Sequence, residues 1–276
     1  MNMYLMIKLG VCKHDVNLFF YVASKHTNII DPINLYQQFY IDGNEERYME
    51  IKNTLKKNVE NKNIDTIFLL NEREYSIDEL GIESDKIKQI IIGHRLKYED
   101  FFKYSKDHSG YLVFANSDIY FDDSIKNLYC SNIDKTKKCY CLLRFEKNGE
   151  LYCNNFKEIS DEQKEMKFDL TKLKFSCHVN NTLYKAYPYS SDTWIIHSNF
   201  NKNIKNMDIP LGVSGCDNRF HYEMMMNGFD IMNEPYFIKT YHNHKSNARN
   251  YDKTEALKGN YLCIVPNLKP FKQYFQ

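Results

Sequence analysis

One stretch decides the expected fold: residues 111–123, which read YLVFANSDIYFDD. It begins with an apolar run, Tyr-Leu-Val-Phe-Ala, typical of a buried strand. The run stops abruptly at three polar residues, Asn116, Ser117 and Asp118. Ligands of an open α/β sheet bind outside the carboxyl ends of its strands, and a carboxylate there can hold a divalent metal ion against a phosphate. The stretch therefore predicts a ligand site, although Asx residues also form simple turns.

The segments before this stretch predict a mostly parallel sheet flanked by helices. Strands are expected at residues 33–41, 64–70 and 87–92. Apolar residues at spacings of three and four predict a helix over residues 48–59, and a second amphipathic piece covers residues 98–104. Strands that alternate with helices are typical of the α/β class.

Polar, ligand-capable side chains follow each of the last two of these strands. The first pair is Asn71 and Glu72, and the second is His94 and Arg95. Because the carboxyl ends of parallel strands meet at one edge of a sheet, we expect these groups to lie near Asp118.

The second half of the chain adds strands and one clear helix. A helix of about three turns starts near Asp217 and stops at Asn227 and Gly228. A hairpin turn is expected at Asn148 and Gly149. No repeat, linker or composition break divides the chain, so one domain is expected. The further strands are predicted at residues 139–145, 151–153, 193–197, 229–232 and 236–241.

Composition excludes several classes of protein. The formal net charge is +1, so we expect no nucleic-acid partner. No apolar run reaches the roughly 20 residues of a membrane span, and no signal peptide is recognisable. The eight cysteines are scattered, as free thiols in a reducing compartment would be, which indicates a cytoplasmic protein. The phosphate-binding loop, the dinucleotide glycine fingerprint and the nucleophile elbow of hydrolases are all missing from the sequence.

Two histidines, His242 and His244, follow the last predicted strand. Residues two apart on an extended strand face the same side, so both imidazoles can approach one metal ion. Such a pair would suit Mn²⁺ better than Mg²⁺. The alternative is that both histidines are simply exposed.

Asp217 lies after a glycine-bearing loop and at the start of the predicted helix. It would either cap that helix or act as a general base for an incoming hydroxyl group. The two interpretations are compatible.

Arginines and one aromatic residue complete the candidates. Arg95 and Arg249 are candidate phosphate contacts, because a guanidinium group offers two donors to phosphate oxygens. Trp194, with Asp192 before it, would give a sugar an aromatic face and a carboxylate. Solvated arginines and a core tryptophan are the alternatives.

Taken together, these blocks resemble the GT-A glycosyltransferases, and most of all the small soluble enzymes of large DNA viruses and some bacteria. The resemblance covers residues 33–251 and leaves residues 1–30 outside, as an edge hairpin or an N-terminal extension. It rests on the sequences LLNE at 69–72, ANSDIYF at 115–121, SDTW at 191–194, GCDNR at 215–219 and YHNH at 241–244, with Arg95 ahead of DFF at 100–102.

The resemblance implies a Rossmann-like, mixed but mostly parallel sheet in a single domain. Residues 33–130 would form the nucleotide-sugar-binding half and residues 139–251 the acceptor-side half. Asp118, with His242 or His244, would bind Mn²⁺ (or Mg²⁺) and the donor diphosphate. Asp217 would be the catalytic base of an inverting enzyme.

Other residues receive binding roles from the same resemblance. Glu72, Arg95, Asn116, Ser117 and Arg249 would contact the nucleotide sugar. Asp192, Trp194 and Asn218 would contact the acceptor. Asn116 departs from the family pattern, because an aspartate usually stands there, and its amide would touch a sugar or ribose hydroxyl instead.

The expected function is transfer of a sugar from a UDP- or GDP-sugar to a glycan or other hydroxyl acceptor. Two other classes stay open. A sugar nucleotidyltransferase uses a similar fold but normally needs a glycine-rich basic loop after its first strand. A non-catalytic carbohydrate-binding protein would bind glycans without metal or nucleotide.

Overall fold

The computed structural model describes residues 31–152, 157–158, 176–179, 182–185, 190–246, 257–264 and 266–267. Contacts divide the chain into residues 1–31 and residues 32–276, and the elements below belong to the second unit. The hairpin or extension expected over residues 1–30 lies outside the described residues, as does Arg249.

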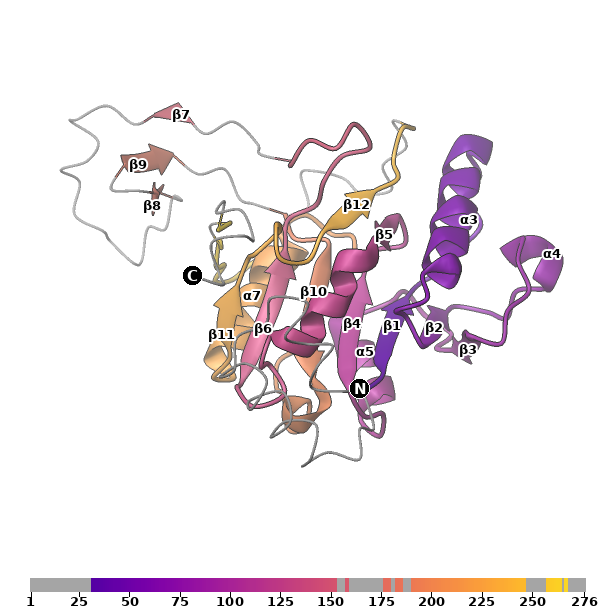
Figure 1. Ribbon diagram of the computed structural model, residues 1–276, viewed down its shortest axis with the longest axis horizontal. Coiled ribbons are helices and arrows are strands. Elements are labelled where there is room, and N and C mark those ends of the chain that lie inside the picture. The colour runs from indigo at the N-terminus through magenta and orange to yellow at the C-terminus, as the bar shows by residue number, and fades with distance from the viewer. Residues whose placement is uncertain are drawn as a thin grey trace, which may run out of the picture. The chain divides into compact units, whose positions relative to one another are not determined.

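A seven-stranded sheet forms the centre of this unit (Figure 1). Neighbouring strands run parallel except at β10, which is antiparallel to both of its neighbours. The mixed, mostly parallel sheet predicted from the sequence is therefore confirmed. In spatial order the strands are β11 (Asp230–Met232), β6 (Lys138–Leu142), β10 (Thr193–His197), β4 (Tyr111–Ala115), β1 (Ile33–Gln37), β2 (Thr66–Asn71) and β3 (Ile87–Ile91).

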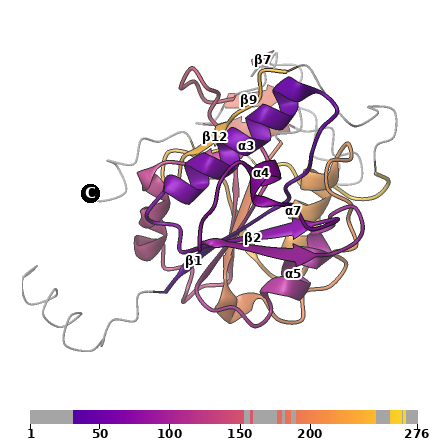
Figure 2. The same cartoon turned by 90° about the vertical axis from the view of Figure 1, so that its right-hand side faces the viewer.

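Helices cover both faces of this sheet (Figure 2). Alternate residues of β4 enter different apolar clusters, because side chains of a strand alternate between its faces. Val113 packs with Ile51 and Leu55 of α3 (Glu45–Glu60), whereas Phe114 packs with the other cluster. That second cluster includes residues of α5 (Tyr98–Ser105) and α7 (Cys216–Met226).

Helix α3 forms where the periodicity predicted it. The Asn44 side chain caps it by accepting a hydrogen bond from the backbone nitrogen of Arg47 at 3.1 Å. Glu45 and Glu46 lie in its first turn and Lys57 in its last, which complements the helix dipole. Helix α7 likewise ends at the predicted Asn227.

Two small sheets form in addition to the central one. Strand β5 (Ile119–Phe121) pairs antiparallel with β12 (Thr240–His242), and β9 (Thr182–Lys185) lies between β7 (Lys157–Glu158) and β8 (Ser176–Val179). The remaining elements are short: α4 (Ile77–Leu80), η1 (Asp123–Cys130) and η3 (Ser198–Phe200).

Two strand predictions in the second half need correction. The turn at Asn148 and Gly149 forms, but β6 pairs with β10 and β11, and only a bridge joins Phe145 to Leu151. The strand expected over residues 236–241 reduces to β12, which pairs with β5 outside the central sheet. Both errors arise because the partner of a strand depends on distant segments.

The described residues include no helix that is long and apolar enough to cross a membrane. Cys130, Cys139, Cys141, Cys216 and Cys263 are free thiols.

A buried polar network fixes the turn after β4. Gln37 donates from Nε2 to the carbonyl oxygens of Asn116 at 2.7 Å and Ile119 at 2.9 Å. Asn58 of α3 donates to Gln37 and to Ile119, both at 2.9 Å, and accepts from the backbone nitrogen of Phe121 at 3.2 Å. Strand β1 and helix α3 thus hold the backbone on both sides of Asp118.

We expect Asn58→Ala to destabilise the protein by about 2–4 kcal/mol, because it leaves several buried hydrogen-bonding groups without a partner. Urea unfolding measures the change. The control is Asn53→Ala on the exposed side of the same helix, which should cost less than about 0.5 kcal/mol. Equal losses in the two variants would contradict the role given to Asn58.

Candidate functional site

The candidate site lies at the carboxyl end of β4. Asn116 and Ser117 are half-buried there, and Asp118 is only 6% exposed. Strand β12 lies beside this turn, since His242 pairs with Ile119 and the backbone nitrogen of Asn243 donates to the Asp118 carbonyl oxygen at 2.8 Å. The pairing of β5 with β12 therefore delivers the C-terminal histidines to the end of β4.

The three predicted metal ligands come together. Asp118 Oδ2 lies 3.2 Å from His242 Nε2 and 3.4 Å from His244 Nδ1. One ligand atom from each residue lies within 4.8 Å of the others. Hydrogen bonds and opposite charges outweigh burial and hold the pKa of the Asp118 carboxyl well below its usual range.

This donor set fits a divalent transition-metal ion. Two imidazoles with one carboxylate suit such ions, whereas Mg²⁺ prefers oxygen ligands alone. Glu146 Oε2 lies 3.3 Å from His242 Nδ1, so the ring presents its other nitrogen to Asp118. A carboxylate behind a histidine is the usual second contact of a metal-binding imidazole. Burial lowers the pKa of His242, but its bonds to Asp118 and Glu146 outweigh this and raise it to about 9.

Arg47 of α3 belongs to the same cluster. Its guanidinium nitrogens lie 2.7 Å from Asp118 Oδ2, 2.9 Å from His244 Nδ1 and 3.2 Å from Glu50 Oε2. The Arg47 side chain is 9% exposed. Sequence reasoning missed it, because an arginine on an amphipathic helix normally indicates a solvated face.

Glu50 ties α3 to the segment after β12. Its Oε1 accepts hydrogen bonds from the backbone nitrogens of Lys245 and Ser246, and its Oε2 accepts one from the Ser246 hydroxyl at 2.9 Å. Asn243 donates to the Glu50 carbonyl oxygen at 2.9 Å. Helix α3 therefore positions His244 as well as Arg47.

Arg144 extends the cluster along the edge of the sheet. It contacts Glu146 at 3.1 Å and Asp192 Oδ2 at 2.5 Å. Asp192 accepts a further hydrogen bond at 2.8 Å from the amide of Asn116. Alternating charges thus run from Glu146 through Arg144 to Asp192, and Arg144 and Glu146 were not predicted from the sequence.

Asp217 lies in the first turn of α7 and is half-buried. Burial, and then the charge of Asp192, raise the pKa of its carboxyl to about 6. The helix is capped by Gly215, which has a φ of +83°, so Asp217 is not the cap. A carboxylate with this pKa can accept a proton near neutral pH.

Other predicted residues lie elsewhere. Trp194 is 1% exposed, packs edge-on against Tyr98 with a 4.8 Å separation of ring centroids, and donates to His221. We therefore assign Trp194 to the core and not to an acceptor platform. Asn218 is buried and donates to the Leu262 carbonyl oxygen at 3.2 Å.

Two predicted nucleotide contacts are exposed. Glu72 follows β2 at the surface. Arg95 donates to the carbonyl oxygens of Leu211 at 3.0 Å and Gly212 at 2.8 Å, so it holds the loop before α7.

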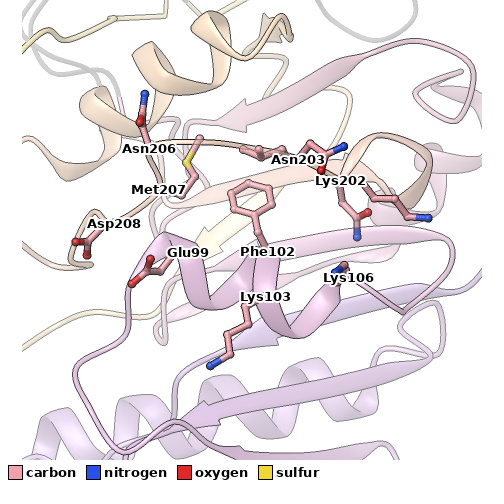
Figure 3. Close-up of a pocket in the computed structure, with 11 residues that line it drawn as sticks. Glu99, Phe102, Lys103, Lys106, Lys202, Asn203, Asn206, Met207 and Asp208 are labelled. Carbon is pink, nitrogen blue, oxygen red and sulfur yellow. The ribbon is translucent and has the colours of Figure 1, made fainter.

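A cavity of about 460 Å³ lies between α5 and residues 201–208 and includes none of the predicted site residues (Figure 3). Phe102 points toward the chain that carries Met207, whereas Lys103 is directed away from it. Because none of the site residues lines it, the cavity is separate from the candidate site.

No protein-family model matches the sequence. None of the curated proteins matches it either.

Solved structures do match. One is the crystal structure of GalNAc-T7 with UDP, GalNAc and Mn²⁺, with a TM-score of 0.49, 10% identity, and 89% of this chain and 47% of that chain covered. The chain thus spans about half the length of that protein.

Two further matches cover 73% of this chain. The 4-diphosphocytidyl-2C-methyl-D-erythritol synthase from Anaerococcus prevotii has a TM-score of 0.40 and 14% identity, with 86% of its chain covered. A CMP:2-keto-3-deoxy-manno-octonic acid synthetase complexed with CTP has a TM-score of 0.43 and 7% identity, with 88% covered.

The raised pKa of Asp217 gives a stability prediction. Below about pH 3 the carboxyl is largely neutral in both the folded and unfolded states, but above pH 6 folding buries a charge. Asp217→Asn should therefore stabilise the protein by about 1–3 kcal/mol at pH 7.5 and by much less at pH 4. Denaturant titrations at both pH values measure this, with the exposed Asp230→Asn as the control. A gain that does not depend on pH would contradict the raised pKa.

Proposed function

We propose that the protein is a metal-dependent glycosyltransferase of the GT-A type that uses a UDP- or GDP-sugar and a glycan or other hydroxyl acceptor. One observation carries the proposal. Asp118, His242 and His244 meet at the carboxyl end of the central strand β4, with Glu146 behind His242. A ligand-binding edge of an α/β sheet is where a nucleotide sugar would bind.

Mn²⁺, or Mg²⁺, would supply positive charge where negative charge develops on the departing diphosphate. Asp118, His242 and His244 would hold the ion. Asn116 and Ser117 would contact the donor sugar or ribose from the same turn.

Asp217 would take the proton of the acceptor hydroxyl group. Its raised pKa follows from burial and from Asp192, while Arg144 neutralises part of the Asp192 charge. A single displacement with Asp217 as base would invert the configuration at the sugar carbon. Asp192 and Asn218 remain our proposed acceptor contacts.

Glu72, Arg95 and Arg249 remain proposed nucleotide contacts. The free thiols in the described part of the chain favour a reducing compartment, and we propose a cytoplasmic location. We propose no nucleic-acid partner, since the net charge is +1.

A sugar nucleotidyltransferase is the second candidate. Arg47 favours it, because it places a basic group in the first turn of the helix after β1. The segment between them, residues 38–44, contains only one glycine, Gly43, and is not a glycine-rich loop.

Incubation with UDP- and GDP-sugars, with and without Mn²⁺, separates these candidates. Metal-dependent hydrolysis or transfer of a nucleotide sugar supports a glycosyltransferase. Release of pyrophosphate from a nucleoside triphosphate and a sugar phosphate supports a nucleotidyltransferase. Glycan binding that ignores both metal and nucleotide supports a non-catalytic protein.

The transfer rate should depend on Asp217. Asp217→Asn should lower kcat by about 10²–10⁴-fold and leave the Kd of the nucleotide sugar unchanged, because only a general base is lost. In the unchanged protein, kcat/KM should rise with pH and level off above about 6, as Asp217 loses its proton. The matched control is Asp230→Asn, which lies away from the site on β11. Undiminished transfer by Asp217→Asn would refute the base assignment.

Metal affinity should depend on His242 and Glu146. In the presence of saturating UDP, His242→Ala should abolish Mn²⁺ binding, and Glu146→Gln should weaken it by about 10–100-fold because the imidazole loses its orienting partner. Electron paramagnetic resonance of free Mn²⁺ gives both affinities. His94→Ala, which removes a histidine paired with Asp100, is the control. Unchanged binding in His242→Ala would rule out this metal site.

A further inference from the structure

The guanidinium group of Arg47 contacts the same ligand atoms that the proposed metal ion would use. One of its nitrogens lies 2.7 Å from Asp118 Oδ2, the oxygen that both histidines also face. Another lies 2.9 Å from His244 Nδ1. The residue therefore lies inside the candidate metal cluster.

A metal ion and this guanidinium group exclude each other at these positions. A divalent ion lies about 2 Å from its ligand atoms. With Arg47 donating to His244 Nδ1, the lone pair of that nitrogen is not available to a metal ion. Two cations on one buried oxygen of Asp118 would also repel each other strongly in a poorly hydrated site.

If Arg47 were displaced from Asp118, only its contacts with Glu50 and Tyr40 would remain available. Glu50 lies 3.2 Å away, but it already accepts hydrogen bonds from two backbone nitrogens and a hydroxyl group of the segment after β12. The Tyr40 hydroxyl lies at 3.5 Å. Glu50 is thus a shared anion, and a buried guanidinium group that loses its other anion, Asp118, is costly, so a new anionic partner would favour the displacement.

A diphosphate can supply that partner. A guanidinium group binds phosphate oxygens through two parallel hydrogen bonds. A diphosphate held by the metal ion would lie within the same cluster and would offer Arg47 a negative charge in place of the Asp118 carboxylate.

We propose that Arg47 is the counter-ion of Asp118 when no metal ion is bound. When the metal ion binds, Arg47 leaves Asp118 and His244 and pairs with the diphosphate. This inference rests on the proposed function. It makes metal and nucleotide binding interdependent. Either ligand binding alone must supply the whole free energy of displacing Arg47, whereas two ligands binding together supply it only once. Such coupling is reciprocal, so each ligand raises the affinity for the other by the same factor.

The test is Mn²⁺ affinity, measured by electron paramagnetic resonance with and without UDP. In the unchanged protein, UDP should tighten Mn²⁺ binding by about 5–150-fold, the usual range of such coupling. Arg47→Gln should bind Mn²⁺ alone at least about tenfold more tightly, because the competing cation is gone, and UDP should then tighten Mn²⁺ binding by a smaller factor than in the unchanged protein, because only the direct contact between metal ion and diphosphate remains. The control is Arg73→Gln, which removes an exposed arginine paired with Glu79 and should match the unchanged protein.

Thermal unfolding provides a second readout, which stays informative even if Arg47→Gln is less stable than the unchanged protein. Arg47→Gln leaves the buried Asp118 without a full partner, so its Tm without metal should fall. Mn²⁺ should raise the Tm of Arg47→Gln more than that of the unchanged protein, because the ion replaces the missing charge.

The outcomes separate this inference from the proposed function. Equal Mn²⁺ affinities for Arg47→Gln and the unchanged protein, with binding lost in His242→Ala, overturn the role of Arg47 and leave the metal site standing. No Mn²⁺ binding by the unchanged protein or by Arg47→Gln, with or without UDP, overturns the metal site and this inference with it.

Discussion

The candidate site depends on a single buried carboxylate. Asp118 is 6% exposed, and one of its oxygens faces Arg47, His242 and His244. Removing such a charge from water costs several kcal/mol, which only well-placed positive partners can offset. The positive partners, Arg47 and His242, come from a helix near the start of the described chain and from a strand near its end. The carboxylate thus requires distant segments to assemble around β4 before it can be buried.

The same requirement explains the polar groups that do not face a ligand. Gln37 and Asn58 hold the backbone of the turn, and Glu50 holds the segment that follows His244. Arg144 joins Glu146 to Asp192 and so continues the alternation of charge toward Asp217. Each group fixes one neighbour of Asp118 or of Asp217, so the geometry of the site depends on the stability of the fold around it.

Sequence patterns predicted the parts of this arrangement that local rules determine. Periodicity located β1 to β4, α3 and α7, and the abrupt polar ending of β4 pointed to Asp118. Residue spacing grouped His242 with His244. The partners Arg47, Arg144 and Glu146 could not be predicted, because their environment comes from tertiary packing and they look like ordinary surface charges in the sequence. Trp194 was misjudged for the related reason that an aromatic residue on a strand fits the core and a binding face equally well.

Among the described strands of the central sheet, β10 alone is antiparallel to both of its neighbours. This direction brings the amino end of β10 to the carboxyl end of β4. Asp192, just before β10, therefore reaches Asn116 and Arg144. Trp194, two residues later, lies opposite Phe114 and Cys141 in the core. A slip of one residue in this register would turn the indole to the other face of the sheet and withdraw Asp192 from Arg144. Because the chain has a single tryptophan, its intrinsic fluorescence reports directly on the strand that places Asp192.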